Sequence, residues 1–327
     1  MKLCVTGSIA TDHLMTFAGR FGDSMIASEL DSLSVSFLVE DLQIRRGGVG
    51  ANIAFSLGCL GLRPLLVGAV GKDFSDYRSW LVRHDVDVEF IRESEVHHTA
   101  RFVCTTDSQS NQIASFYPGA MAEARAIELG PIIERVGPLD LVVVSPNDPA
   151  AMLRHTEECR DRGIAFVADP SQQLAFLEGN DIRALVDGAA FLFTNDYEAA
   201  LIEKKTGWSA QEILDRVETR VTTKGEKGCV IESAGEPTIE VAAVPISGVV
   251  DPTGVGDGFR SGYLAALSWG LSPQRCAQVG SAIAALVIET TGPQDYELVP
   301  AEFLERFTGA YGAQAAAEVT AEISALR

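Results

Sequence analysis

The chain has 327 residues, of which 46% are apolar, so it is large and apolar enough for one domain with a substantial buried core. Its 26 Lys and Arg residues face 45 Asp and Glu residues, and this acidic surplus argues against nucleic-acid and anionic-membrane partners. The six cysteines stand singly without zinc-site spacing, and we find no signal-peptide or membrane-spanning pattern. We therefore expect a globular cytoplasmic protein with reduced thiols.

Strands and helices alternate along most of the chain. The first apolar strand is expected at residues 3–10, and a helix is expected to begin at Pro149. Further strands, interleaved with helices, are expected at residues 139–146, 163–170, 189–196 and 219–225. Runs such as LVVV and AFVA are apolar at every position, which is typical of parallel strands covered on both faces. The pattern predicts a doubly wound α/β fold with a mostly parallel sheet flanked by helices.

Two stretches depart from this alternation. Residues 34–46 and 99–117 have strand-like patterns without helices between them, and we interpret them as a small antiparallel sheet, with strands within residues 12–46 and 97–120. An extra hairpin at the edge of the main sheet fits the pattern equally well. In the first stretch, Phe37, Leu38 and Val39 are consecutive apolar residues, whereas a strand with one face in water should alternate. We therefore expect the second face to pack against another subunit in a homodimer.

A glycine-rich turn, DPTGVGDGF at residues 251–259, precedes a helix that is expected to start near Asp257. The dinucleotide-binding fingerprint lacks its third glycine here, and no Gly-Lys pair is followed by the Ser or Thr of a P-loop. A helix N-terminus can still bind an anion through its backbone N–H groups. Asp257 would then be free to accept a proton from an attacking hydroxyl. The alternative, an Asp that only caps the helix, is equally consistent with this segment alone.

Two segments together carry a family resemblance. GGVGANIAFSLGCLGLRPLLVGAVG at residues 47–71 and DPTGVGDGFRSGYL at residues 251–264 resemble both signatures of the ribokinase-like, or PfkB-type, carbohydrate kinases. The resemblance continues through TGSIATDHL, SFYPGAM, DPSQQLA, FTNDYE and VTTKGEKG, where it is closest to the adenosine kinases of actinobacteria. It implies a ribokinase-like fold, with residues 1–327 forming a single kinase domain and the small sheet acting as a lid.

The resemblance also assigns roles to individual residues. Asp257 takes the position of the catalytic base, and Gly254, Val255 and Gly256 take the positions of the anion hole. Pro252 stands where the family more often has a hydroxyl residue, and it is excluded from the anion hole because it has no backbone N–H. The positions that imply substrate binding are Ser8, Asp12, Ser36, Gly48, Asn52, Phe102, Phe116, Gln172 and Gln173.

The side chains at several of these positions suit a nucleoside. Asp12 and Asn52 have oxygens that can accept hydrogen bonds from neighbouring ribose hydroxyls, although a turn residue and a helix cap are the alternatives. Phe102 and Phe116 lie in the two expected lid strands, where they could stack on a purine. Ordinary packing within the lid is the alternative for both rings.

Further positions match the family's nucleotide and metal contacts. Asn195 and Glu198 match its NxxE motif, which implies ATP phosphates and a hydrated Mg²⁺ ion nearby, although Glu198 alone would suggest a solvated helix carboxylate. The implied contacts to the phosphates of ATP are Thr223, Gly225, Gly228, Gly256 and Asn195. A plain hairpin turn is the alternative for residues 223–228, and activation by a monovalent cation stays open.

The function that the resemblance implies is ATP-dependent phosphorylation of adenosine at its ribose 5'-hydroxyl, which yields AMP and ADP. A kinase of a free sugar such as ribose is the first alternative. The second is a nucleoside-binding sensor without activity, and the joint presence of Asp257, Asn195 and Glu198 argues against it. The expected partners are adenosine, ATP and a second copy of the chain, with no nucleic acid or membrane.

Overall fold

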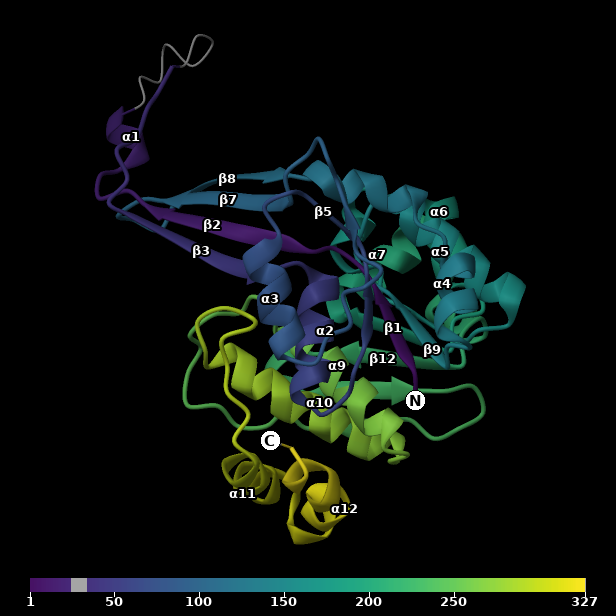
Figure 1. The fold of residues 1–327 in the computed structure, drawn as a ribbon. Helices are drawn as coiled ribbons and strands as arrows, with labels where there is room; N and C mark the ends of the chain where they lie inside the picture. Colours follow the sequence, from purple (N-terminus) through teal and green to yellow (C-terminus); the bar gives the residue numbers. More distant parts are fainter. Residues whose placement is uncertain (25–33, 327) are drawn as a thin grey trace.

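The computed structural model describes residues 1–24 and 34–326 (Figure 1). Its main element is an eight-stranded sheet with the strand order β14-β13-β12-β11-β10-β9-β1-β4. The strands from β4 to β12 in this order are parallel, while β13 and β14 are antiparallel at one edge. Their bounds are β1 (Leu3–Thr6), β4 (Leu65–Val67), β9 (Leu141–Val144), β10 (Phe166–Ala168), β11 (Phe191–Asn195), β12 (Thr219–Thr223), β13 (Cys229–Glu232) and β14 (Ile239–Val241). The predicted mostly parallel sheet is confirmed.

Helices cover both faces of this sheet, as the side chains of β1 show. Leu3 and Val5 pack into a core with α2, α9 and α10, whereas Cys4 points to the other face and packs into a second core with α4, α5 and α6. The bounds of the helices are α1 (Phe21–Ser24), α2 (Val49–Cys59), α3 (Ser75–Arg83), α4 (Leu129–Val136), α5 (Pro149–Arg162), α6 (Gly179–Val186), α7 (Asp196–Thr206), α8 (Ala210–Leu214), α9 (Val255–Ser268), α10 (Pro273–Ile288), α11 (Pro300–Tyr311) and α12 (Ala313–Ser324). Because successive strand residues point to opposite faces, an uninterrupted apolar strand needs both layers.

A second sheet, with the order β3-β2-β7-β8, projects from one end of the main sheet (Figure 1). We call it the lid; its strands are β2 (Ala10–Thr16), β3 (Asp41–Gly47), β7 (Ala100–Thr106) and β8 (Gln112–Tyr117). Because these four strands pair with one another and not with the main sheet, they form a projecting sheet rather than a hairpin at its edge. The expectation of a fully antiparallel sheet is wrong in one respect, since β2 and β7 are parallel. Both strands run outward from the main sheet in the same direction.

The predicted strand at residues 34–46 begins later than expected, because only β3 from Asp41 onward pairs with the lid. Phe37, Leu38 and Val39 therefore precede the strand, and the premise of three consecutive apolar residues within it is wrong. Phe37 instead packs against the rings of Phe17 and Phe21, at 5.0 and 4.9 Å between ring centroids. The apolar run at this point forms a small aromatic cluster at the outer end of the lid.

The remaining elements are short. They are the strands β5 (Ala69–Val70) and β6 (Arg92–Glu93) and the 3-10 turns η2 (Gly119–Ala126), η3 (Ser171–Ala175) and η4 (Gly225–Lys227). All six cysteines are free thiols. Over residues 1–24 and 34–326, none of the helices is both long and apolar enough to pass through a bilayer.

Candidate active site

The carboxyl ends of the parallel strands meet at one edge of the main sheet, below the lid. Ser8 follows β1, Ser171 follows β10, and Asn195 and Thr223 end β11 and β12. All four residues border a single cavity of about 590 Å³, which also touches the inner face of the lid. An open parallel sheet places ligands at this edge, so the strand order itself positions the cavity.

The glycine-rich turn forms one wall of the cavity at the start of α9. Gly254 is the N-cap residue, with φ at +74°, a left-handed conformation that glycine adopts without strain. A Cβ atom at this position would also collide with Pro293. No side chain caps the first turn of α9, so its backbone N–H groups remain available to an anion.

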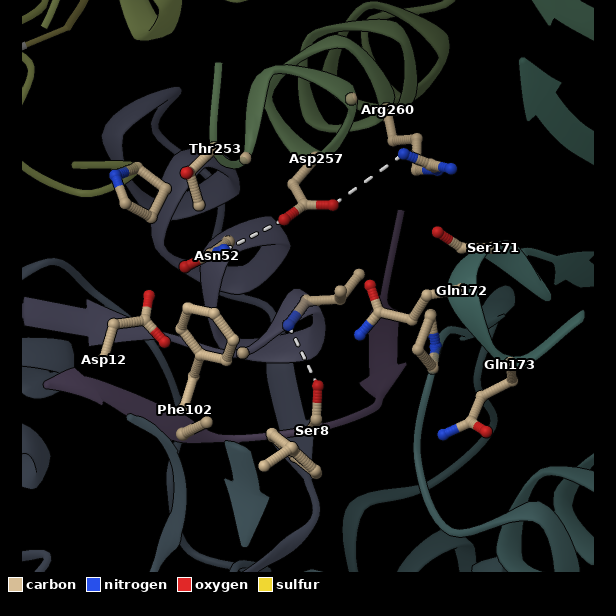
Figure 2. Close-up of a pocket in the computed structure, with 18 of the residues that line it drawn as sticks. Ser8, Asp12, Asn52, Phe102, Ser171, Gln172, Gln173, Thr253, Asp257 and Arg260 are labelled. Carbon is tan, nitrogen blue, oxygen red and sulfur yellow. Dashed lines mark hydrogen bonds and ion pairs between the residues drawn. The ribbon is translucent and has the colours of Figure 1, made fainter. Parts of the chain in front are cut away.

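Asp257 lies in this first turn and faces the cavity (Figure 2). Its Oδ2 accepts a hydrogen bond from Asn52 Nδ2 at 2.9 Å, and its Oδ1 lies 3.7 Å from Arg260 Nη1. Burial raises the pKa of Asp257 to about 6, while Arg260 and the Asn52 hydrogen bond act in the opposite direction. The partners of this carboxylate are the side chains of Asn52 and Arg260 rather than the backbone N–H groups at the start of α9, which favours a base over a cap.

Asp12 and Asn52 approach the cavity from different elements. Asp12 lies on the inner face of β2, where burial and the neighbouring Asp251 raise its pKa to about 6 and Arg45 lowers it. Asn52 lies in α2, and its Oδ1 accepts a hydrogen bond from Gln294 Nε2 at 2.8 Å, which fixes the orientation of the amide. Because Asn52 also donates to Asp257, one of the two expected hydroxyl-binding residues is in direct contact with the expected base.

The N-terminus of α2 supports this arrangement. Ser8 Oγ accepts a hydrogen bond from Val49 N at 3.0 Å, so the hydroxyl of Ser8 holds the start of the helix (Figure 2). Gly48 has φ at +92°, and a Cβ atom there would come within 2.6 Å of Ser8 O. Glycine is therefore required by the close passage of α2 beneath the first strand of the lid. Both residues line the cavity as predicted.

The lid contributes an aromatic wall. Phe102 on β7 and Phe116 on β8 are directly paired across the two strands, on the same face as Asp12 and Leu14 of β2. Both rings line the cavity, and Phe116 is 50% exposed, which is a large exposure for an aromatic residue. The prediction that the two rings point into one cleft above Asp12 and Asn52 is consistent with this register.

The opposite wall is formed by η3 and the residue that follows it. Gln172 and Gln173 line the cavity, and Gln173 Nε2 donates to the backbone carbonyl of Asn147 at 2.9 Å. Phe176, which sequence reasoning did not select, lines the same wall and is 79% exposed. An aromatic side chain that borders a cavity and is mostly exposed is available for contact with a flat ligand.

Asn195 and Glu198 occupy the start of α7. Asn195 Oδ1 accepts from Glu198 N at 2.8 Å, and Glu198 Oε2 accepts from Asn195 N at 2.9 Å, so the pair forms a capping box. Glu198 lines the cavity, and its Oε1 accepts a long hydrogen bond from Ser171 Oγ, another lining residue, at 3.4 Å. One carboxylate oxygen therefore remains for a hydrated Mg²⁺ ion, which needs few protein ligands. Among the described residues, no three His, Cys, Asp or Glu side chains gather into a metal site.

An ion pair joins the lid to the glycine-rich turn. Arg45 on β3 lies 3.0 Å from Asp251 Oδ2, and both side chains are largely buried. Asp251 also accepts hydrogen bonds from the backbone N–H groups of Thr253 and Gly292. The same carboxylate thus contacts the lid and the loop that leads to α9.

Most of the predicted site residues converge on the cavity. Those that line it are Ser8, Asp12, Gly48, Asn52, Phe102, Phe116, Gln172, Gln173, Asn195, Glu198, Thr223, Gly254, Gly256 and Asp257. Ser36, Val255, Gly225 and Gly228 do not line it. Ser36 is exposed in the segment before β3, and Gly228 lies against the backbone of Val241 and Ala243, which accounts for its glycine.

Sequence reasoning missed two charged residues beside Asp257. Arg260 lines the cavity, and Asp169 lies behind it with its side chain fully buried. Asp169 begins the segment DPSQQLA, and Arg260 lies in DPTGVGDGFRSGYL, so both stand in segments that carry the family resemblance. The available signal was the spacing of Asp257 and Arg260, since residues three apart on a helix share a face.

Comparisons with known proteins agree with this geometry. The family model described as "pfkB family carbohydrate kinase" matches residues 15–299. The nucleoside kinase of Methanothermobacter thermautotrophicus is 30% identical over 87% of this chain and 91% of its own, and that of Methanocaldococcus jannaschii is 30% identical over 76% and 80%. The structure of Burkholderia thailandensis nucleoside kinase in complex with inosine is 34% identical, with a TM-score of 0.83, over 95% of this chain and 99% of that one.

Proposed function

Because the chain belongs to the pfkB family of carbohydrate kinases, we propose that it transfers a phosphoryl group from ATP to the 5'-hydroxyl of a nucleoside, with adenosine as the expected substrate. Similarity to relatives named nucleoside kinases supports the substrate class. The similar structure from Burkholderia thailandensis contains inosine, so inosine is the first competitor to adenosine.

The observation that carries this proposal is the arrangement around Asp257. A buried carboxylate in the first turn of a helix with an uncapped N-terminus lines the same cavity as Asn52 and Asp12, two residues that can accept hydrogen bonds from ribose hydroxyls. Asp257 accepts the proton of the 5'-hydroxyl while the 5' oxygen of the nucleoside forms a bond to the γ-phosphorus. The bond from that phosphorus to the β–γ bridging oxygen breaks, ADP leaves, and the N–H groups of residues 254–257 stabilise the phosphoryl charge.

Glu198 and Asn195 are the residues that we propose to hold a hydrated Mg²⁺ ion with the ATP phosphates. When bound, the ion would neutralise part of the charge on the phosphate oxygens. The capping box fixes the Glu198 side chain and leaves Oε1 toward the cavity, which fits this role. Thr223, at the end of β12, lies on the same side and is the proposed phosphate contact.

The aromatic wall favours a nucleoside over a free sugar. Phe102, Phe116 and Phe176 border the cavity, and a purine can stack on such rings whereas ribose has no flat face to offer. We also propose that the chain forms a homodimer through the outer face of the lid. A sugar kinase remains the second candidate because the family model describes carbohydrate kinases.

The experiment that tests the function is a substrate panel. ADP release would be measured with ATP and Mg²⁺ in the presence of adenosine, inosine, guanosine, ribose or fructose. We expect the highest kcat/KM for a purine nucleoside, and phosphorus NMR of the product should place the phosphate on the 5' oxygen. A higher kcat/KM for ribose or fructose would establish the sugar kinase instead. Nucleoside binding without any ADP release would establish a sensor.

A further inference from the structure

Arg260 is a buried cation next to the proposed base. It lies three residues after Asp257 on the same face of α9, and its side chain is 9% exposed. Its Nη1 is 3.7 Å from Asp257 Oδ1, while its Nη2 is 2.7 Å from Asp169 Oδ1 (Figure 2 shows the first pair). The guanidinium therefore bridges two carboxylates, one at the cavity and one behind it.

Asp169 is the anchor of this arrangement. It follows β10 directly, and its side chain is fully buried, so leaving it without a cation would be costly. Burial raises the pKa of Asp169 to about 7; Arg260 lowers it, whereas Asp257 and Glu198 raise it. Its charged partner is Arg260 Nη2, and Asp169 itself does not line the cavity, so the carboxylate holds the guanidinium from within the protein.

Arg260 also lies against the anion-binding turn. A Cβ atom at Gly256 would come within 2.6 Å of Arg260 Nη1, so the guanidinium occupies the space that a side chain at Gly256 would fill. The residues lining the cavity include two cationic side chains, Arg45 and Arg260. Arg45 is paired with Asp251. Arg260 is thus the cation that stands beside the proposed base.

The charges that face this guanidinium come from three elements. They are Asp257 on α9, Asp169 after β10 and Glu198 on α7, and the amide of Asn52 on α2 completes the surroundings of Asp257. Three carboxylates surround one guanidinium, so the negative charge in this buried region exceeds the positive charge. Such a surplus favours protonation, and a protonated Asp257 cannot act as a base. The positive charge of Arg260 opposes this protonation.

We propose that Arg260, anchored by the buried Asp169, is a positioning residue that orients Asp257 and supplies the positive charge that keeps its carboxylate ionised. The inference rests on the proposed function, because it assumes that Asp257 is the base. It assigns to Asp169 the role of holding Arg260 in place. Neither residue needs to touch the substrate.

The test is the pH dependence of kcat/KM for the best nucleoside, measured from pH 5 to 9 at saturating ATP. In Arg260→Gln, the acidic limb of the profile should move upward by about 1 to 3 pH units, the usual effect of losing an opposite charge at this distance. In Asp169→Asn, the guanidinium remains but loses its anchor. The acidic limb should therefore also move upward, by less than in Arg260→Gln.

Two further variants separate this role from a loss of stability. Arg260→Lys keeps the charge and should restore the acidic limb to within about one pH unit of the unchanged protein, even if turnover falls. Arg220→Gln is a matched control, because Arg220 pairs with Glu232 at 2.6 Å in a partly buried ion pair that does not line the cavity. It should lower the melting temperature and leave the pH profile in place.

The outcomes are distinct. Upward shifts in both Arg260→Gln and Asp169→Asn, the second smaller, support the inference, whereas an unmoved limb in Arg260→Gln or a downward shift in Asp169→Asn overturns it. If Arg260→Gln does not fold, Asp169→Asn and Arg260→Lys still decide the question. Full turnover in Asp257→Asn would reject the proposed base itself. Loss of turnover in Asp257→Asn together with an unmoved limb in Arg260→Gln would reject only the role of Arg260.

Discussion

Asp257 accepts a hydrogen bond from Asn52 and faces the cavity, and replacing it tests its chemistry directly. Asp257→Asn keeps the size of the side chain but cannot accept the substrate proton. We expect turnover to fall by about 10²- to 10⁴-fold, the usual contribution of a general base. Nucleoside affinity, measured by calorimetry, should change far less. Near-normal turnover in the folded variant would reduce Asp257 to a structural residue.

Phe102 and Phe116 provide the second prediction at the scale of single residues. If each ring stacks on the base, replacing either with Ala should lower kcat/KM for adenosine by about 5- to 150-fold, which corresponds to 1 to 3 kcal/mol of stacking. The specificity constant for ribose, which has no base, should change much less. Equal losses for both substrates would show that the rings only support the lid and would favour the sugar kinase.

At the scale of elements, the capping box of α7 links helix stability to the proposed metal role. Glu198→Gln should raise the Mg²⁺ concentration needed for half-maximal activity, because a neutral amide is a weaker ligand than a carboxylate. Activity should also disappear with EDTA and return with Mg²⁺. An unchanged Mg²⁺ titration in Glu198→Gln would reject the metal role.

The control for this prediction is a second capping box. Ser209 and Glu212 at the start of α8 make the same pair of backbone hydrogen bonds, and neither lines the cavity. Glu212→Gln should therefore weaken a helix start to a similar degree without altering the Mg²⁺ titration. Comparing the melting temperatures of the two variants isolates the contribution of the cap.

The outer face of the lid supports the proposed homodimer through residues other than Phe37, Leu38 and Val39. Opposite the cavity, β3 and β8 present Leu42, Ile44 and Ile113, which are 51%, 61% and 44% exposed. A solvated sheet face should be mainly polar, so three exposed apolar side chains on one face favour an interface.

We expect a dimer by light scattering at micromolar concentration, and a monomer for Ile44→Lys, which would bury an unpaired charge in the interface. Val96 provides the matched control, because it is 78% exposed outside the lid strands. Val96→Lys should remain dimeric. A monomeric unchanged protein would remove the argument.

At the scale of the whole molecule, local patterns predicted the parallel sheet, and the family resemblance supplied most of the residues that line the cavity. Apolar runs such as LVVV in β9 need cover on both faces, and the carboxyl ends of parallel strands meet at one edge, so fold and site position follow together. The glycine-rich turn was likewise recognisable because its conformation depends on adjacent residues.

Features that depend on distant residues were not predicted. The pairing of Arg260 with Asp169 requires α9 and the end of β10 to meet, which neither segment specifies alone. The start of β3 at Asp41 is set by pairing with β2, which the sequence of β3 alone does not specify. The pattern therefore predicts a strand that includes Phe37, whereas in the structure Phe37 packs on Phe17 and Phe21. The composition of residues 34–46 correctly predicted that a strand lies there, but it placed the start of that strand too early.

The ion pair between Arg45 and Asp251 has an energetic consequence for two ligands. Arg45 belongs to the lid over the nucleoside side of the cavity, and Asp251 holds the loop that leads to the proposed phosphate site. When the lid is placed so that the ion pair forms, the loop is held in place as well. Each ligand should therefore strengthen binding of the other by the same factor.

Calorimetry of adenosine with and without a non-hydrolysable ATP analogue should show a factor of about five or more, which Arg45→Gln should bring close to one. A coupling factor that is unchanged in Arg45→Gln would show that the two ligands are not coupled through this ion pair. With the pair intact, the apparent affinity for either ligand would rise with the concentration of the other. The rate of the enzyme would then depend on nucleoside and ATP together rather than on each independently.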